Sequence, residues 1–207
     1  MSVTRSLRVG TSAPAVLTPK QRATLVLQSA TSPEAAMAMD DAEFNADFFL
    51  TQGISARSLR AAKLTPQMLH QRGATTARVL RQLGYDALDL TDATFCANCI
   101  AVFGASDLLA EFLQTAADAV ALAGSSAARQ LRLDVGTLLV LCAGAPVEAQ
   151  SVIAQTPPRG GALQGVAAAT LLDTGLRGGA LHGLGYTASS ICAQTMATAT
   201  ELEQLGL

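Results

Sequence analysis

The sequence predicts an all-α protein. We expect a solenoid-like array of short capped helices, arranged as helix pairs of about 20 residues, with an irregular N-terminal arm. Two observations support this prediction. The ten-residue phrase Ser/Thr-Ala-x-x-Leu-x-x-x-Gly-Φ, in which Φ is apolar, recurs along much of the chain. Half of the residues are apolar, mainly Ala, Leu and Val, and Trp is absent. Such small side chains favour close packing of short helices over a thick two-layer core.

Each copy of the phrase carries the start and stop signals of a helix. Its first position suits an N-cap, its second is often Ala or Pro, and its ninth is often Gly. In the copy at 76–85, Thr76 is the expected N-cap and Gly84 the expected left-handed residue after the helix. Leu80 should then lie under Tyr85, as in a Schellman motif. The copies lie at 55–64, 65–74, 76–85, 86–95, 177–186, 187–196 and 198–207.

The same frame extends upstream to Asn45 and into the middle of the chain, where Gly136–Ala145 is expected to form another unit. Residues 106–135 and 146–166 fit it poorly, and we interpret them as degenerate units or longer merged helices. Residues 1–33 form the expected arm, and residues 34–207 the expected helical repeat domain. The central residues should be buried: Leu59, Leu69, Leu80, Leu90, Ile100, Leu171, Leu181, Ile191 and Leu202.

The tandem phrase resembles the very short, about ten-residue α-helical repeats that occur as arrays in some protist, algal and large-virus proteins. The resemblance covers roughly residues 45–207, with gaps. It implies a protein-binding or structural role, and it brings no catalytic residues with it.

Charge is distributed in blocks along the chain. Residues 1–33 contain Arg5, Arg8, Lys20 and Arg22 and no acid, and residues 57–81 are likewise basic without an acid. Residues 34–47 and 86–118 are acidic without a base. Because the net charge is only −2, bulk attraction to nucleic acid is not implied, and alternating blocks favour specific docking or head-to-tail self-contact. The expected partner-binding residues are Arg5, Arg8, Lys20, Arg22, Arg57, Arg60, Arg78 and Arg81.

These observations predict a non-enzymatic structural or scaffolding subunit of a large macromolecular assembly, such as a capsid, cytoskeletal array or organellar complex. It would act by protein–protein interaction with other subunits, copies of itself among them. The alternative is a nucleic-acid-associated protein that uses the arm and the Arg57–Arg81 block. Residues 80–88 and 181–189 loosely resemble a helix-hairpin-helix, but both lack its usual second glycine.

A third hypothesis is a thiol or metal site at Cys96-Ala-Asn-Cys99. Cys96 falls at an expected N-cap position, where a helix N-terminus would lower the pKa of its thiol. Further ligands with suitable spacing are absent, so we expect both residues to be small core residues instead. The Gly-Gly pairs at 160–161 and 178–179 are expected to form tight turns, since no P-loop lysine accompanies them.

No cofactor or metal is expected. Cys96, Cys99, Cys142 and Cys192 do not form a disulfide framework, so we expect reduced interior thiols and an intracellular, reducing compartment, within a large particle or complex. The basic, Ser- and Thr-rich arm also resembles a mitochondrial targeting segment, which is an alternative to an arm bound to a partner. No membrane span is expected, because the apolar stretch at Val135–Val147 is too short.

Overall fold

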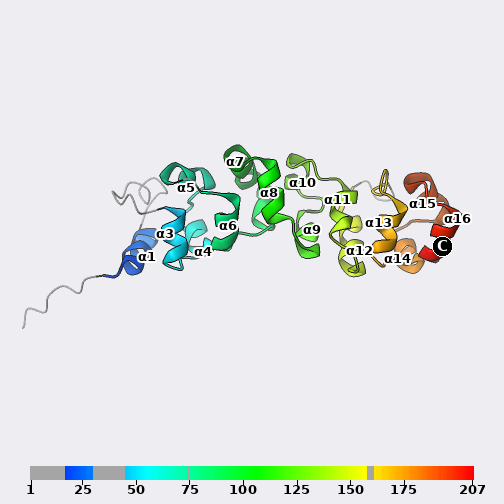
Figure 1. The fold of residues 1–207 in the computed structure, drawn as a ribbon, viewed down its shortest axis with the longest axis horizontal. Helices are drawn as coiled ribbons and strands as arrows, with labels where there is room; N and C mark the ends of the chain where they lie inside the picture. The colour runs from blue at the N-terminus through cyan, green and yellow to red at the C-terminus, as the bar shows by residue number, and fades with distance from the viewer. Residues whose placement is uncertain (1–16, 30–44, 74, 158–160) are drawn as a thin grey trace, which may run out of the picture.

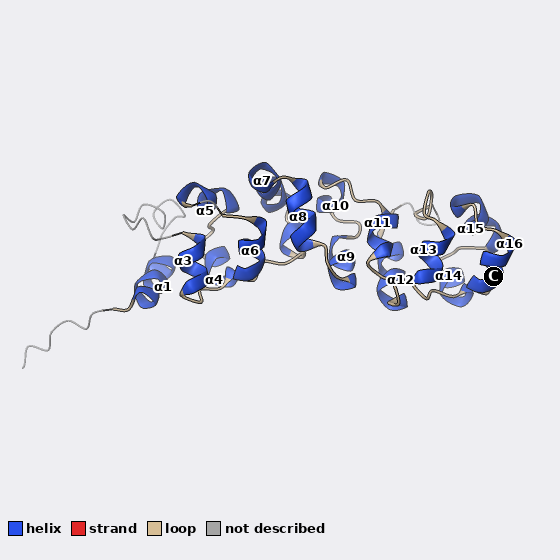
Figure 2. Cartoon of the chain, in the orientation of Figure 1, coloured by secondary structure: helices blue, strands red, loops and turns tan. Residues whose placement is uncertain are grey.

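A computed structural model of the chain describes residues 17–29, 45–73, 75–157 and 161–207. Every regular element in these ranges is helical, and they contain no strand (Figure 2). The predicted all-α class is confirmed for this part of the chain. The elements are α1 (Pro19–Ser29), α3 (Ala46–Thr51), α4 (Ala56–Ala61), α5 (Pro66–Arg72), α6 (Ala77–Leu83), the 3₁₀ turn η1 (Asp89–Thr91), α7 (Ala93–Phe103), α8 (Ala105–Phe112), α9 (Ala116–Leu122), α10 (Ser126–Gln130), α11 (Val135–Val140), α12 (Pro146–Gln155), α13 (Ala168–Asp173), α14 (Gly178–Gly183), α15 (Ala188–Thr195) and α16 (Ala199–Leu205).

The first residue of the phrase acts as the predicted N-cap. The hydroxyl of Thr65 accepts a hydrogen bond from the N–H of Met68 at 3.2 Å, and the hydroxyl of Thr76 accepts one from Val79 at 3.3 Å. Thr187 and Thr198 do the same, each within a reciprocal capping box. These bonds satisfy backbone donors that a short helix leaves free.

The predicted helix endings are also present. Gly84 and Gly185 follow their helices with φ of +97° and +87°. The N–H of Tyr85 donates to the C=O of Leu80 at 3.2 Å, and that of Tyr186 to Leu181 at 3.0 Å. These bonds are those of the Schellman motif, so each aromatic residue folds back on the central Leu of its own unit.

Burial agrees with the predicted register. Of the nine predicted central residues, seven are fully buried, while Ile100 and Leu202 are partly buried. The seven are Leu59, Leu69, Leu80, Leu90, Leu171, Leu181 and Ile191.

The unit at 86–95 does not form the predicted full helix. Asp86 and Asp89 exchange bonds between side chain and backbone N–H, at 2.9 and 3.2 Å, and close a single 3₁₀ turn. Asp92 then caps a new helix by accepting from the N–H of Phe95 at 2.8 Å. Cys96 consequently lies inside α7 and not at an N-cap, which corrects that prediction.

The arm is helical over Pro19–Ser29, so the prediction of an irregular arm is wrong there. Thr18 and Gln21 form a reciprocal cap, with N–H bonds of 2.9 and 3.3 Å. Ala23 and Leu27 are buried, and α1 contacts α4. The start signal was present in the sequence, since Thr18-Pro19-x-Gln21 combines a capping box with Pro at the first helical position. Residues 1–16 and 30–33 of the predicted arm lie outside the described residues.

The helices follow one another in an elongated row from α1 to α16 (Figure 1). Contacts repeatedly join helices that are about thirty residues apart, such as α1 with α4, α3 with α6, α9 with α12 and α13 with α16. Two backbone bonds do the same: Gly144 N–H donates to Asp173 C=O at 2.8 Å, and Gly165 N–H to Gln194 C=O at 3.1 Å. Each helix therefore packs mainly on the third helix after it in the chain. The predicted 20-residue helix pair is not the packing unit.

Within the described residues, no single helix is long and apolar enough to cross a membrane. The helices α7 and α8 would reach that length together, but the chain bends by 113° between them.

Candidate functional site

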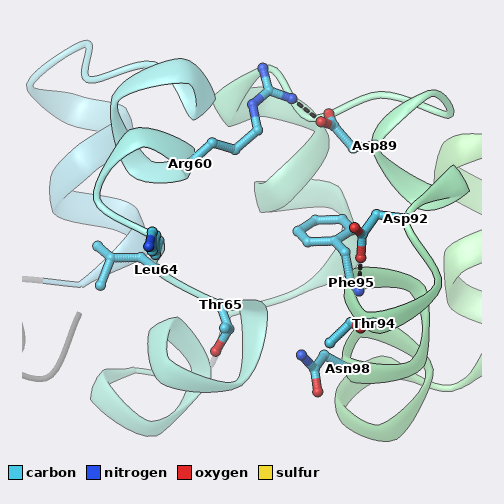
Figure 3. Close-up of a pocket in the computed structure, with 9 residues that line it drawn as sticks. Arg60, Leu64, Thr65, Asp89, Asp92, Thr94, Phe95 and Asn98 are labelled. Carbon is cyan, nitrogen blue, oxygen red and sulfur yellow. Dashed lines mark hydrogen bonds and ion pairs between the residues drawn. The ribbon is translucent and has the colours of Figure 1, made fainter. Parts of the chain in front are cut away.

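A pocket of about 530 Å³ lies between the end of α4 and the start of α7 (Figure 3). One wall comes from residues 60–65, where α4 ends and α5 begins, and the other from residues 89–98, which include η1 and the first turns of α7. The two walls are about thirty residues apart in the sequence, so the pocket lies between two segments that only the folded chain brings together. Its volume is in the range of small-ligand sites.

The first wall is held by the ending of α4. The N–H of Leu64 donates to the C=O of Leu59 at 3.0 Å, which places Lys63 in the left-handed conformation with φ of +57°. Thr65 follows immediately and caps α5. Lys63 and Thr65 therefore have fixed backbone positions, although neither residue is buried.

The second wall is held by the carboxylates that end η1 and start α7. Asp92 caps α7 through the N–H of Phe95, and Asn98 lies one turn further along the helix (Figure 3). The ring of Phe95 stacks on the buried ring of Tyr85, with centroids 5.2 Å apart and planes 20° apart. The stacking fixes an apolar surface beside the polar groups.

Arg60 and Asp89 join the two walls by an ion pair (Figure 3). The guanidinium of Arg60 also lies over the ring of Tyr85, 5.3 Å from its centroid. The second oxygen of Asp89 accepts the N–H of Asp86. Burial raises the pKa of the Tyr85 hydroxyl strongly, and the charge of Arg60 opposes this rise only in part.

The structure separates the predicted partner-binding residues into different environments. Arg60 is paired with Asp89, and Arg81 is paired with Asp118 at 3.3 Å and lies 5.7 Å from the ring centroid of Phe112. The basic block and the following acidic block therefore neutralise each other at two points within the chain. The exposed members of the remaining set are Lys20, Arg22, Arg57 and Arg78. Arg5 and Arg8 lie outside the described residues.

The cysteine motif has the properties of core residues. Cys96 and Cys99 are fully buried in α7. Burial raises the pKa of both thiols, that of Cys99 to about 12 with smaller contributions from Cys96 and Asp89. A buried neutral thiol is a poor nucleophile. Cys142 is also buried, but Cys192 is exposed, so the prediction of four interior thiols is wrong for Cys192. No group of three or more His, Cys, Asp or Glu with metal-binding geometry occurs in the described part of the chain.

The glycine pair at 178–179 lies at the first turn of α14. A Cβ added to Gly178 would lie 2.2 Å from the carbonyl oxygen of Gly206, so this residue is required for close backbone packing. The earlier pair falls partly on residues 158–160, outside the described part. Residues 80–88 and 181–189 form the helix endings described above at Gly84 and Gly185.

Sequence reasoning missed this pocket. Lys63 belongs to the basic block, and no sequence pattern gives Thr65, Phe95 or Asn98 a functional role. One signal was available, because Lys63 occupies the ninth position of its unit, where several other units have Gly.

Comparison with known proteins gives no relative: no family model, no curated protein and no solved structure matches the chain.

Proposed function

We propose that the chain is a non-enzymatic structural or scaffolding subunit of a large macromolecular assembly, and that it acts by protein–protein interaction. In this proposal the helices form a solenoid-like array with about three units per turn. Each unit uses its buried central residue to hold its neighbours and leaves its outer face available for partners. The assemblies that we consider are a capsid, a cytoskeletal array or an organellar complex.

The observation that supports this proposal is the recurrent contact between units about thirty residues apart along an elongated row (Figure 1). A helix of six or seven residues is unstable alone and depends on such neighbours. A row built from neighbour contacts offers a long surface relative to its mass, as repeat proteins that bind other proteins do.

The nucleic-acid alternative has less support. Arg60 and Arg81 come from the block that would contact phosphates, yet each already pairs with a carboxylate of its own chain. Arg57, Lys63 and Arg78 of this block are exposed, and so few cations provide only a small electrostatic contribution to binding.

The test is the native size of the chain. Tagged protein should be isolated from its source cells at low salt, sized by sedimentation, and cross-linked before its neighbours are identified by mass spectrometry. The proposal expects a particle much larger than the monomer, with cross-links from this chain to other proteins. A chain that sediments as a monomer at its natural concentration would refute it, and nuclease-sensitive sedimentation would favour the nucleic-acid alternative.

A further inference from the structure

Two contacts of the same construction join distant segments of the N-terminal half of the array, from α1 to α8, to the segments that follow. Arg60 pairs with Asp89, 29 residues further along the chain, and Arg81 pairs with Asp118, 37 residues further along. Each guanidinium also lies over a buried aromatic ring, 5.3 and 5.7 Å from its centroid. Both arginines hold the sixth position of their ten-residue units. We call these two contacts the arginine clasps.

The carboxylates of the clasps are held in place by their own segments. Asp89 accepts the N–H of Asp86 at 2.9 Å, and Asp118 accepts the N–H of Thr115 at 3.1 Å. Their side chains are only 13% and 9% exposed. Separation of the two segments therefore breaks an ion pair and a cation–π contact together and leaves a fixed carboxylate without its cation. Because both attractions depend on charge, salt should weaken them.

The C-terminal half, from α11 to α16, joins its distant segments by different chemistry. The N–H of Gly144 donates to the C=O of Asp173 at 2.8 Å, and the N–H of Gly165 donates to that of Gln194 at 3.1 Å. No ion pair joins described residues of this half. Neutral backbone bonds are not screened by salt as ion pairs are, so the two halves should respond differently to ionic strength.

The buried apolar residues divide at nearly the same place. One cluster is formed by helices from α1 to α10, and the other by helices from α9 to α16. The helix α9 contributes Leu122 to the first cluster and Ala119 and Ala123 to the second. The rings beneath both clasps, Tyr85 and Phe112, belong to the first cluster. The clasps therefore stabilise one of two cores that meet at α9.

We propose that the N-terminal half opens as a cooperative unit of its own, while the C-terminal half stays folded, and that the two arginine clasps control this opening. Parts of a protein with separate cores can unfold separately at a lower free energy than the whole. Salt loosens the clasps and favours the open form of the N-terminal half. The inference does not depend on the proposed function, and either can fail without the other.

Three buried cysteines are reporters of the two halves. Cys96 and Cys99 belong to the first cluster and Cys142 to the second. The full chain carrying Cys192→Ser, which lacks the exposed thiol, is labelled with an excess of N-ethylmaleimide, and the rate at each cysteine is read by mass spectrometry. We expect Cys96 and Cys99 to react together and faster than Cys142. Molar sodium chloride should raise the rate of this pair about fivefold and change that of Cys142 less than about twofold.

Substitutions in the same background test the clasps themselves. Arg60→Met and Arg81→Met should each raise the labelling rate of the first cluster about fivefold. The double variant should raise it about twentyfold, because the two clasps share no residue, and should lose the response to salt. Arg57→Met and Arg78→Met are the matched controls, since these arginines are exposed on the same two helices and form no ion pair within the described ranges. Both controls should keep the wild-type rates and the response to salt.

Two results would overturn the inference. Equal labelling rates and equal salt responses at Cys142 and at the pair Cys96 and Cys99 would mean that the chain opens as a single unit. An unchanged salt response in the double variant would mean that the clasps do not control the opening. The salt series needs no clasp substitution, so it decides the first point even where the double variant does not fold.

Discussion

In the described part of the chain, three residues occupy a backbone conformation that elsewhere belongs to glycine. Lys63, Arg132 and Met196 have φ near +56°, at the ends of α4, α10 and α15. The other helix ends with positive φ carry glycine. The capping geometry is therefore fixed by the fold, and the residue that occupies it determines how much strain the unit tolerates.

The first prediction concerns Gly84. Replacing Gly84 with Val should lower the free energy of unfolding by about 1–2 kcal/mol or more, because a β-branched residue is strained at φ of +97°. An added Cβ would meet only the Cβ of Ala56, at 4.0 Å, so the loss comes from the backbone and not from a clash. Urea denaturation measures it. Gly84→Asn is the control and should cost less, since Asn tolerates the left-handed region. Equal stability of the Val and Asn variants would contradict the left-handed assignment.

The second prediction concerns the thiols. In the native chain Cys192 should react rapidly with a thiol reagent at neutral pH, and Cys96, Cys99 and Cys142 should react at the rate of unfolding, because burial keeps them protonated and inaccessible. Cys192→Ser should remove the fast phase. Its survival in that variant would mean that the core around at least one buried cysteine, in α7 or after α11, opens without global unfolding.

The same burial predicts a loss of stability at high pH. The pKa of Cys99 is about 12 in the folded chain, against an ordinary value of 9.0. The unfolded chain therefore releases this proton first, and stability that is complete below about pH 9 declines as the pH rises toward 12. Denaturation curves of the wild type and Cys99→Ala, recorded at several pH values, measure this effect. The Ala variant should show a shallower decline, and parallel pH profiles would contradict the assignment.

At the scale of the helix, the sequence predicted most of the capping chemistry, because the signals lie within the unit itself. The predicted start of a helix was wrong where an aspartate nearby in the sequence acts as the N-cap instead. Asp134 caps α11 by accepting the N–H of Thr137 at 2.7 Å, two residues before the predicted start at Gly136. The buried residues are consequently Leu138 and Leu139, and Val140 at the predicted central position is 62% exposed.

This shift of register gives the next prediction. Leu80→Ala should cost about 2–5 kcal/mol, because Leu80 is fully buried. Val140→Ala removes an apolar side chain from a position that the ten-residue frame treats as equivalent, yet its effect should stay within about 0.5 kcal/mol. Thermal unfolding of both variants makes the comparison. A large loss of stability in the Val140 variant would instead support the predicted ten-residue register, in which Val140 is a buried central residue.

At the scale of the whole molecule, the sequence did not indicate which units touch. Capping signals are local, whereas the relative placement of two helices depends on how their side-chain surfaces fit together. The pocket at Lys63 was hidden for the same reason, because its two walls come from units that the frame treats as separate. Two glycines have a second role that composition does not reveal. Gly144 and Gly165 both have positive φ, and their N–H groups bond the C=O groups of Asp173 and Gln194 in later segments.

Adjacent glycines of α14 test this packing between distant units. Gly178→Ala would bring a Cβ to 2.2 Å from the backbone oxygen of Gly206 and should destabilise by about 1–3 kcal/mol. Gly179→Ala meets nothing within 4 Å and should be neutral or stabilise by up to about 1 kcal/mol through helix propensity. Amide hydrogen exchange in α14 and α16 should show which of the two helices loses protection in the Gly178→Ala variant. Two variants of equal stability would mean that the contact between α14 and the end of α16 is not formed.

The N-terminal arm gives the last prediction, because folding and assembly can be separated there. The sequence predicts that the basic arm crosses to another subunit and that deleting residues 1–33 leaves a folded chain that fails to assemble. The burial of Ala23 and Leu27 in α1 changes the design, since that deletion also uncovers part of the core beside α4. The informative deletion is residues 1–16, which removes Arg5 and Arg8 and leaves α1 in place.

We expect the 1–16 deletion to keep the thermal midpoint of the full chain and to be lost from the large particle. The 1–33 deletion should lose both the particle and part of its stability, through the exposure of apolar surface on α4. Sedimentation and thermal unfolding of the two proteins, side by side, distinguish these effects. Normal assembly of the 1–16 deletion would show that the first basic residues do not dock on a partner, and would leave the outer faces of the helices as the surface that joins this chain to its assembly.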